Sequence, residues 1–366
     1  MSDQILMGAP TRAAGGDASI TERARAGELV IDLHCHVHVN SADELLKDSF
    51  KPQAEPMLAF ASAATRETNQ AQMCAVHSKL TSVQSRLKDM DRLGIDIQAL
   101  SPSPFQFYYW AEPELGLAAA RLVNDGVAEL VAQSPGRFVG LGTVPLQAPE
   151  LAVLELDRLV RTLGLRGVEI ATSVQGEELS GPRLRPFFAK AEELGILIFL
   201  HPNGFSDGRR LADHYFINII GNPLDATIAV SHLIFSGALD AMPGLKLCIA
   251  HGGGFLPAYS GRMDHAHAAR PDCRRCIQMP PSSYLKRLYF DTVVFTVAQL
   301  EYLIKEYGAE HIVLGTDYPY DMAEPDPVGL VDRVEELPAK ARAAILGGNA
   351  ARLLGLRADE LLACGD

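Results

Sequence analysis

Two histidines end an apolar run near the start of the chain. Residues 29–38 read Leu-Val-Ile-Asp-Leu-His-Cys-His-Val-His, which is typical of a buried β-strand. Because side chains alternate between the faces of a strand, we expect His34 and His36 to point the same way. Two imidazoles on one face are half of a transition-metal site. The H-x-H pattern is short, so without further ligands it would indicate only a polar strand end.

Three later apolar runs are also followed by side chains that can bind a metal. His201, His251 and Asp317 each come within two residues of the end of such a run. Any one of them alone would more often be an ordinary hydrogen-bonded residue, but together with the first pair they indicate a metal site. Imidazoles with one carboxylate suit Zn²⁺ best, and Mn²⁺ or Fe²⁺ are also compatible. Water in such a site is activated near neutral pH, and His251, followed by three glycines, is placed to accept its proton.

The elements that would position these residues alternate along the chain. We expect helices at 82–93, 113–133, 149–163, 184–194, 209–241 (in segments) and 297–307, and strands from 30 and at 95–100, 138–143, 167–172, 196–200, 245–250, 288–293 and 312–315. Eight short apolar strands separated by helices predict an α/β fold, the (β/α)8 or TIM barrel, in which all strands deliver their carboxyl ends to one mouth. An open, doubly wound sheet is the alternative. The barrel is favoured because it brings ligands from separate strands together.

The domain organisation follows from the same pattern. We expect one barrel domain over 28–366, preceded by a flexible arm at 1–27 that lacks the apolar core of a signal peptide or membrane span. Residues 37–80, with irregular and mixed polar composition, would form a lid or wall of the site. Terminal helices from 338 to 362 would seal the barrel.

Composition limits the partners. The chain has 366 residues, and 33 basic against 45 acidic residues give a formal charge of −12. This charge argues against nucleic acid or an anionic membrane as the main partner.

Six cysteines scattered through a large chain predict reduced thiols in the cytoplasm. The pair Cys273 and Cys276 has the spacing of a zinc or redox site, but no second pair follows it, so we expect no function there.

Several long motifs resemble a known family. They are Ile31-Asp-Leu-His-Cys-His36, residues 90–100 and 137–152, Leu200-His-Pro202, Ala250-His-Gly-Gly-Gly254 and Leu314-Gly-Thr-Asp-Tyr-Pro319. On these motifs the chain resembles the amidohydrolase superfamily and, within it, the aminocarboxymuconate-semialdehyde decarboxylase (ACMSD) group of metal-dependent decarboxylases. The resemblance implies a zinc site held by His34, His36, His201 and Asp317, with His251 as the base. It also implies a homodimer in which Arg262 reaches the neighbouring site to hold a substrate carboxylate, while Arg270 lies near its own.

The chain departs from the group around the substrate. Cys74, with His77 three residues on, stands where members carry an arginine that contacts a carboxylate, and Phe216 lies near the position of their tryptophans. One carboxylate anchor fewer predicts a monocarboxylic acid. Tyr320, just beyond Asp317, is a candidate for the pocket wall. Aromatic residues at 105–110 would either stack on a flat substrate or pack on the barrel rim.

These observations predict a divalent-metal-dependent, oxygen-independent decarboxylase of an unsaturated or aromatic carboxylic acid in a catabolic pathway. His251 and Asp317 would handle the proton, and Arg262, Arg270, Tyr320 and Phe216 would contact the substrate. The alternative is a hydrolase or hydratase that acts on an amide, lactone, C–C or C=C bond with the same site. A binding protein with a vestigial site is the third hypothesis.

Overall fold

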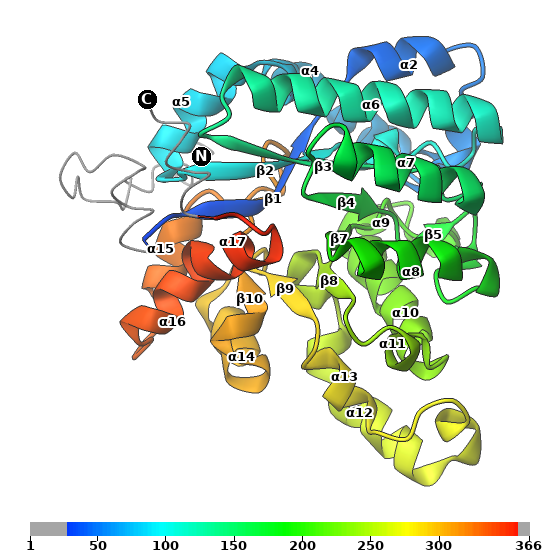
Figure 1. The fold of residues 1–366 in the computed structure, drawn as a ribbon, viewed down its shortest axis with the longest axis vertical. Coiled ribbons are helices and arrows are strands. Elements are labelled where there is room, and N and C mark those ends of the chain that lie inside the picture. The colour runs from blue at the N-terminus through cyan, green and yellow to red at the C-terminus, as the bar shows by residue number, and fades with distance from the viewer. Residues whose placement is uncertain (1–27, 358–366) are drawn as a thin grey trace.

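Eight parallel strands form a barrel in the computed structural model, which describes residues 28–357 (Figure 1). Their order around the sheet is β1 (Ile31–Val37), β2 (Ile97–Pro102), β3 (Phe138–Gly142), β4 (Gly167–Ile170), β7 (Leu197–Leu200), β8 (Lys246–Ile249), β9 (Tyr289–Asp291) and β10 (Ile312–Val313). The first and last strands meet where Leu33 N donates to Leu314 O (2.9 Å) and His36 N to Tyr318 O (2.7 Å). The predicted (β/α)8 barrel is confirmed. The arm expected at 1–27 lies outside the described residues.

Helices connect the strands and cover the outside of the barrel. They include α5 (Val83–Leu93), α6 (Pro113–Gln133), α7 (Pro149–Arg161), α8 (Arg185–Leu194), α9 (Phe216–Ile219), α10 (Gly221–Phe235), α11 (Ala238–Ala241), α12 (Leu256–Ala269), α13 (Pro281–Leu285), α14 (Val297–Tyr307) and α15 (Pro327–Asp332). The bounds of α6 and α14 are those expected from the sequence. A two-stranded hairpin of β5 (Ser173–Val174) and β6 (Glu177–Glu178) follows β4.

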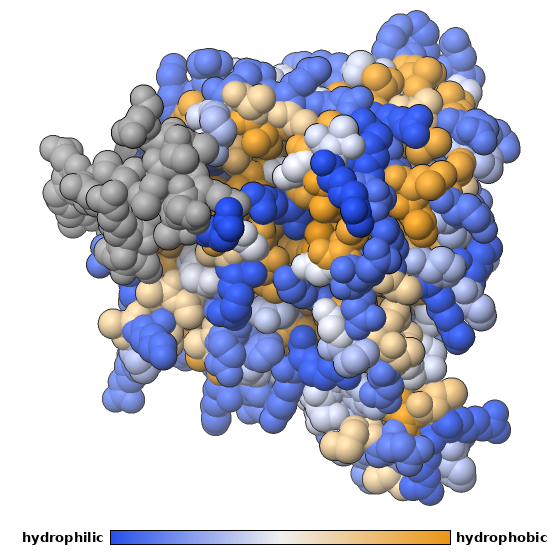
Figure 2. Space-filling view, viewed as in Figure 1, coloured by the Kyte–Doolittle hydropathy of each residue, from blue (hydrophilic) through white to orange (hydrophobic). Residues whose placement is uncertain are grey.

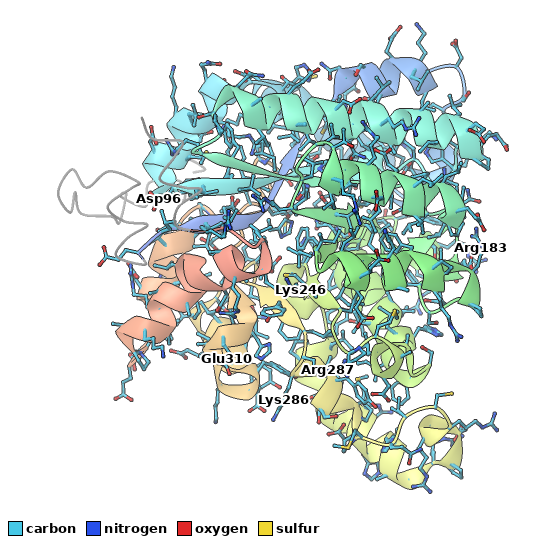
Figure 3. All side chains as sticks on the ribbon, in the orientation of Figure 1. Asp96, Arg183, Lys246, Lys286, Arg287 and Glu310 are labelled. Carbon is cyan, nitrogen blue, oxygen red and sulfur yellow. The ribbon has the colours of Figure 1, made fainter. Side chains whose placement is uncertain are left out.

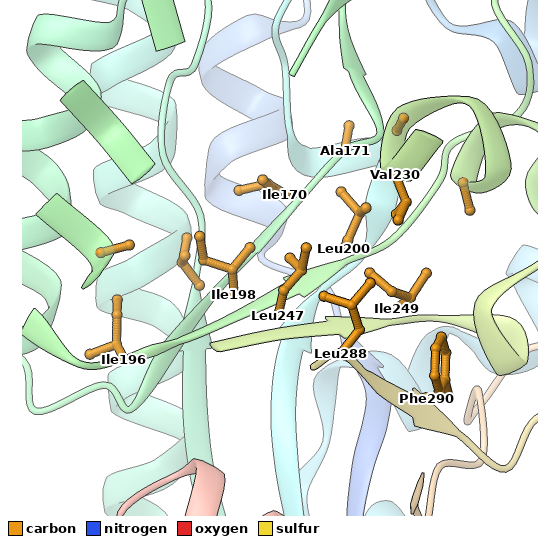
Figure 4. Packing of buried hydrophobic residues seen from close by; sticks show 14 of the residues in the cluster. Ile170, Ala171, Ile196, Ile198, Leu200, Val230, Leu247, Ile249, Leu288 and Phe290 are labelled. Carbon is orange, nitrogen blue, oxygen red and sulfur yellow. The ribbon is translucent and has the colours of Figure 1, made fainter. Parts of the chain in front are cut away.

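Two hydrophobic layers hold the barrel together. Side chains such as Leu33, Leu141 and Phe199 fill its interior. Alternate side chains of the same strands face the helices, as Figure 4 shows for Ile198 and Leu247. This alternation is the reason that nearly continuous apolar runs fit parallel strands buried on both faces.

The C-terminal helices close the end of the barrel where the strands begin. After α16 (Ala339–Ala343), helix α17 (Asn349–Leu353) places Leu353 and Leu354 against Leu29 and Ile31 of the interior layer. Figure 3 labels polar side chains at this end, including Lys246, the first residue of β8, whose Nζ donates to Gly195 O (2.7 Å). The strands therefore open toward the opposite end, where the predicted ligands lie.

The insertion after β1 is more regular than we expected. It contains α2 (Asn40–Leu46), α3 (Pro56–Ala59) and a helix of 19 residues, α4 (Ala63–Thr81). The Ser62 side chain caps α4 by accepting from Thr65 N (3.2 Å). The expectation of irregular structure missed this helix because its sequence lacks a clear apolar stripe: only Thr65 and Leu80 of α4 are buried.

The surface is largely polar on the face shown in Figure 2, with hydrophobic patches between hydrophilic ones. Helices α12 and α13 project from the barrel at the bottom of Figure 1. Among residues 28–357, no helix combines the length and apolar character needed to cross a lipid bilayer.

Candidate metal centre

A bulge in β1 turns the first two histidines into the barrel. Asp32 pairs with Gln98 but Cys35 pairs with Leu100, so β1 has one extra residue between these pairs. Ile31 and Leu33 face the interior before the bulge, and without the extra residue the next inward position would be Cys35. The bulge shifts the alternation, so that His34 and His36 face inward instead. Both histidines are fully buried, and they point the same way, as predicted.

Four predicted ligands converge at the carboxyl ends of β1, β7 and β10. The Oδ1 atom of Asp317 lies 3.4 Å from His34 Nε2 and 3.2 Å from His36 Nε2. The His201 ring centroid is 5.0 Å from that of His34 and 4.8 Å from that of His36. Asp317 has a left-handed backbone, with φ of 62°, a conformation that concentrates at functional sites in residues other than glycine.

His251 belongs to the same cluster. Its Nε2 lies 3.7 Å from Asp317 Oδ2, and its ring centroid lies 4.9 Å from that of His201. The three glycines after it all have positive φ, and a Cβ on Gly254 would lie 2.4 Å from Pro223 O. These glycines therefore permit the close backbone approach that we expected. His251 is partly exposed, whereas His34 and His36 are fully buried.

Asp291 of β9 fixes His34, and the sequence analysis missed it. Its Oδ2 lies 2.6 Å from His34 Nδ1, and its carboxylate also accepts from the backbone N–H groups of His251 (3.0 Å) and Gly252 (2.8 Å). Burial opposes protonation of His34, but the negative charges of Asp317 and Asp291 outweigh it and raise the pKa of His34 to about 10. The centre therefore holds a strong negative potential around His34 Nε2.

Glu169 of β4 is a second carboxylate that the sequence analysis missed. It is fully buried, and its Oε1 and Oε2 lie 3.9 Å from His201 Nδ1 and 3.8 Å from His36 Nδ1. Burial raises the pKa of Glu169 well above its ordinary value. An acidic residue inside a short buried strand was the available signal, because ionisable residues are almost never fully buried without a partner.

The donor atoms fit a bound cation. His34 Nε2, His36 Nε2 and both ring nitrogens of His201 are buried without a hydrogen-bond partner in the described structure. Orphaned buried nitrogens are costly, and a metal ion bonded to them would satisfy them. Two overlapping groups have donor atoms close enough to share an ion: one contains His34, His201, His251 and Asp317, and the other contains His36, Glu169 and His201. His36 Nε2 lies closer to Asp317 than His251 Nε2 does, although the group that contains Asp317 includes His251 and not His36.

A cavity of about 390 Å³ opens above the centre. Its volume lies toward the lower end of the range typical of small-molecule sites. His201, Asp317 and Tyr320 line it, together with residues of α3 and α4. The Tyr320 hydroxyl lies 2.6 Å from Ser103 Oγ, and burial raises the pKa of this tyrosine. Phe216 is absent from the described lining, whereas its neighbour Tyr215 is part of it.

The two arginines expected to bind the substrate lie away from the cavity above the centre. Arg262 is exposed on the projecting helix α12. Arg270 is exposed just beyond the same helix and donates to Asp272 through Nε (3.0 Å) and Nη2 (2.8 Å). Neither arginine lines the cavity above the centre.

Comparison with known proteins identifies the family of this chain. The sequence model of the family described as Amidohydrolase matches residues 31–356. The chain belongs to the amidohydrolase family. The histidines and the aspartate at the ends of β1, β7, β8 and β10 all lie within the matched residues.

Relatives of this amidohydrolase include several decarboxylases. It is 36% identical over 278 residues to 2-amino-3-carboxymuconate-6-semialdehyde decarboxylase from Dictyostelium discoideum, covering 76% of this chain and 77% of the relative. The crystal structure of 5-carboxyvanillate decarboxylase from Sphingomonas paucimobilis is similar with a TM-score of 0.81 and 27% identity, covering 90% of this chain and 100% of that one. The dihydroxybenzoic acid decarboxylase from Polaromonas sp. JS666, with bound manganese and the inhibitor 2-nitroresorcinol, has a TM-score of 0.78 and 26% identity, covering 91% and 99%.

Proposed function

We propose that this amidohydrolase is a divalent-metal-dependent, nonoxidative decarboxylase of an aromatic or unsaturated carboxylic acid. The observation that carries the proposal is the set of buried, unpartnered imidazole nitrogens around Asp317 at the floor of a cavity of small-molecule size. Decarboxylases acting on such acids are its relatives in sequence and in structure.

His34, His36, His201 and Asp317 would hold the ion. When bound, it would supply positive charge that stabilises the negative charge developing in the transition state. The histidine-rich donor set suits Zn²⁺, and Mn²⁺ or Fe²⁺ also fit it. The Polaromonas enzyme contains manganese, so we include Mn²⁺ in every reconstitution below.

The remaining chemistry is the movement of one proton. When the bond between the substrate carbon and its carboxylate breaks, CO2 leaves and the electron pair remains on that carbon, which must then gain a proton. His251 Nε2, on the partly exposed side of the cluster, is the group that delivers it. Asp317 Oδ2, 3.7 Å from this nitrogen, is the second group within reach of the same proton. Tyr320 forms part of the wall against which the substrate lies.

Arg262 acts in a neighbouring subunit in this proposal. The guanidinium is exposed on a helix that projects away from its own barrel, as a contact with a second copy requires. Guanidinium groups hold carboxylates at two points. We therefore propose a homodimer in which Arg262 completes the partner's site, and in which Arg270 and Phe216 lie close to the substrate.

We also propose a cytoplasmic location, because the five described cysteines, Cys273 and Cys276 among them, are unpaired thiols.

Release of CO2 tests the function. The protein, reconstituted separately with Zn²⁺ and Mn²⁺, is incubated without oxygen with a panel of aromatic and unsaturated acids that includes 5-carboxyvanillate and 2,6-dihydroxybenzoate. We expect CO2 release in the metal-loaded protein and none in His201→Ala. Net uptake of water without CO2 would instead indicate a hydratase or hydrolase and contradict the proposal.

A further inference from the structure

A second cavity, of about 600 Å³, adjoins the one above the metal centre. Its lining comes from the insertion after β1, from the loops that follow β2, β4 and β7, and from α10. Asn203 lines both cavities, but His34, His36, His201 and Asp317 are absent from the lining of the second one. The second cavity has the volume of a small-molecule site, and the proposed reaction gives it no role.

Two buried carboxyl groups, those of Glu55 and Asp225, line the second cavity. The two residues are only 5% and 7% exposed. Glu55 accepts from Trp110 Nε1 (2.6 Å) and Asn203 Nδ2 (2.7 Å), and Asp225 Oδ2 accepts from the hydroxyl of Thr172. All three partners are neutral, and in the described part of the chain no basic side chain forms an ion pair with either carboxyl.

The hydrogen bonds within the lining occupy donors and leave acceptors. The indole of Trp110 donates to Glu55, and the side-chain amide of Gln175 donates to Tyr109 O. Asp225 Oδ1 and the side-chain carbonyl oxygens of Asn203 and Gln175 accept no hydrogen bond from residues 28–357. A ligand that donates several hydrogen bonds and carries positive charge would satisfy these acceptors and compensate the two carboxyl groups.

Aromatic rings form much of the remaining wall. Phe60 and the residues from Phe107 to Trp110 line the second cavity, whereas Phe105 lines the cavity above the metal centre. The rings of Tyr108 and Trp110 lie edge to face, with centroids 6.1 Å apart. Aromatic faces attract cations and also pack against flat apolar groups. The wall therefore favours a ligand that combines a cation with an aromatic ring.

We propose that the second cavity binds a small aromatic primary amine in its ammonium form. The carboxyl groups of Glu55 and Asp225 hold the ammonium group, and the ring of the amine packs against Trp110 and Tyr108. An ammonium group has three N–H donors and no acceptor, which matches two carboxyl groups and the free side-chain oxygen of Asn203. This site goes beyond the proposed function, because it uses none of the residues assigned to the metal or to the proton.

Two ligands that differ only in charge test the proposal. The Mn²⁺-loaded protein is titrated calorimetrically at pH 6.5 with benzylamine and with benzyl alcohol. We expect benzylamine to bind the wild type about tenfold more tightly than benzyl alcohol. Glu55→Gln and Asp225→Asn should each weaken the binding of benzylamine and leave that of benzyl alcohol unchanged. Glu67→Gln, which removes an exposed carboxylate of α4 outside the second cavity, is the matched control and should bind as the wild type does.

Release of protons gives a second measurement, which needs no variant. Burial raises the pKa of Glu55 to about 7 and that of Asp225 to about 6. A cation beside a carboxyl group lowers its pKa, so we expect roughly half a proton or more to be released for each amine bound at pH 6.5. The release is measured from the dependence of the binding enthalpy on the ionisation enthalpy of the buffer.

Three results would overturn the proposal. They are equal affinity of the wild type for the two ligands, binding of benzylamine without proton release, and unchanged binding of benzylamine in both Glu55→Gln and Asp225→Asn. Titration of His201→Ala distinguishes the two cavities. We expect this variant to bind benzylamine as the wild type does, whereas loss of binding would place the amine at the metal centre and would also refute the proposal.

Discussion

Asp291 Oδ2 lies 2.6 Å from Nδ1 of His34, and the opposite nitrogen of the same ring faces Asp317. The carboxylate of Asp291 thus fixes the orientation of His34, a proposed metal ligand, from the side of the ring opposite the proposed ion site. It also accepts from the backbone N–H of His251. One buried side chain therefore holds both the ring of His34 and the backbone of His251, the proposed proton donor, in position. Such partners of metal-bound histidines raise the basicity of the ligand and fix its tautomer.

Replacing Asp291 should therefore weaken metal binding. In Asp291→Asn the charge that holds His34 is lost, and we expect the affinity for Zn²⁺ or Mn²⁺ to fall by about 10 to 100-fold. The measurement is a titration against a chelator of known affinity. Asp272→Asn, which removes an exposed carboxylate that pairs with Arg270, is the control and should bind metal as the wild type does. Equal affinity in the two variants would contradict the role given to Asp291.

The site residues that could be predicted from the sequence lie just beyond strand ends, whereas those that were missed lie within strands. Residues just beyond strand ends stand out, because a polar side chain there interrupts an apolar run, and this found His201, His251 and Asp317. Glu169 and Asp291 lie inside or at the last position of short strands. We treated those strands as apolar runs, and which face a strand residue takes depends on register.

The β1 bulge shows the same limit. Alternation along β1 correctly placed His34 and His36 on one face, but it could not say which face, because the extra residue between Asp32 and Cys35 is a property of pairing with β2. Helix α4 was missed for a related reason. Helix α4 buries little apolar surface, so its sequence lacks the periodicity that marks a packed helix and shows which side faces the barrel.

Two variants should distinguish loss of the metal from loss of proton transfer. His201→Ala removes a proposed ligand whose two ring nitrogens have no hydrogen-bond partner in the described structure, so both metal content and CO2 release should be lost. His251→Asn should retain the ion and lose about 10²- to 10⁴-fold in turnover, the range attributed to a positioned acid or base. Metal content is read by elemental analysis and turnover by CO2 release. A His251→Asn protein that lacks metal would place this histidine among the ligands instead.

Removal of the ion should also lower the stability of the fold. An ion that binds only the native state adds about 2.7 kcal/mol when its concentration is 100 times its Kd. We therefore expect the Tm of the chelator-treated protein to rise steadily with added Mn²⁺ in calorimetric scans. The Tm of His201→Ala should not respond over the same range. A flat response in the wild type would show that the native state does not bind the ion preferentially.

Glu55, in the insertion after β1, should make stability depend on pH. Its side chain is 5% exposed and accepts from Trp110 Nε1 (2.6 Å) and Asn203 Nδ2 (2.7 Å). Burial outweighs these hydrogen bonds and raises the pKa of Glu55 from 4.5 to about 7. Between these two values the folded state binds more protons than the unfolded state. The contribution of Glu55 to the free energy of unfolding should therefore be largest below pH 4.5. It should fall as the pH rises toward 7 and beyond.

The size of this effect is about 3 kcal/mol for a shift of this extent. We expect the free energy of unfolding of the wild type, minus that of Glu55→Gln, to fall by up to this amount between pH 5 and pH 8 in urea titrations. The difference isolates Glu55, because the buried carboxyls of Asp32 and Asp225, whose pKa values are also raised, are present in both proteins. Glu67→Gln, at an exposed position of α4, is the matched control for the loss of a glutamate charge in the same insertion. A difference for Glu55 that stays constant from pH 5 to pH 8 would contradict the prediction, and would mean that the hydrogen bonds from Trp110 and Asn203 offset the burial of Glu55.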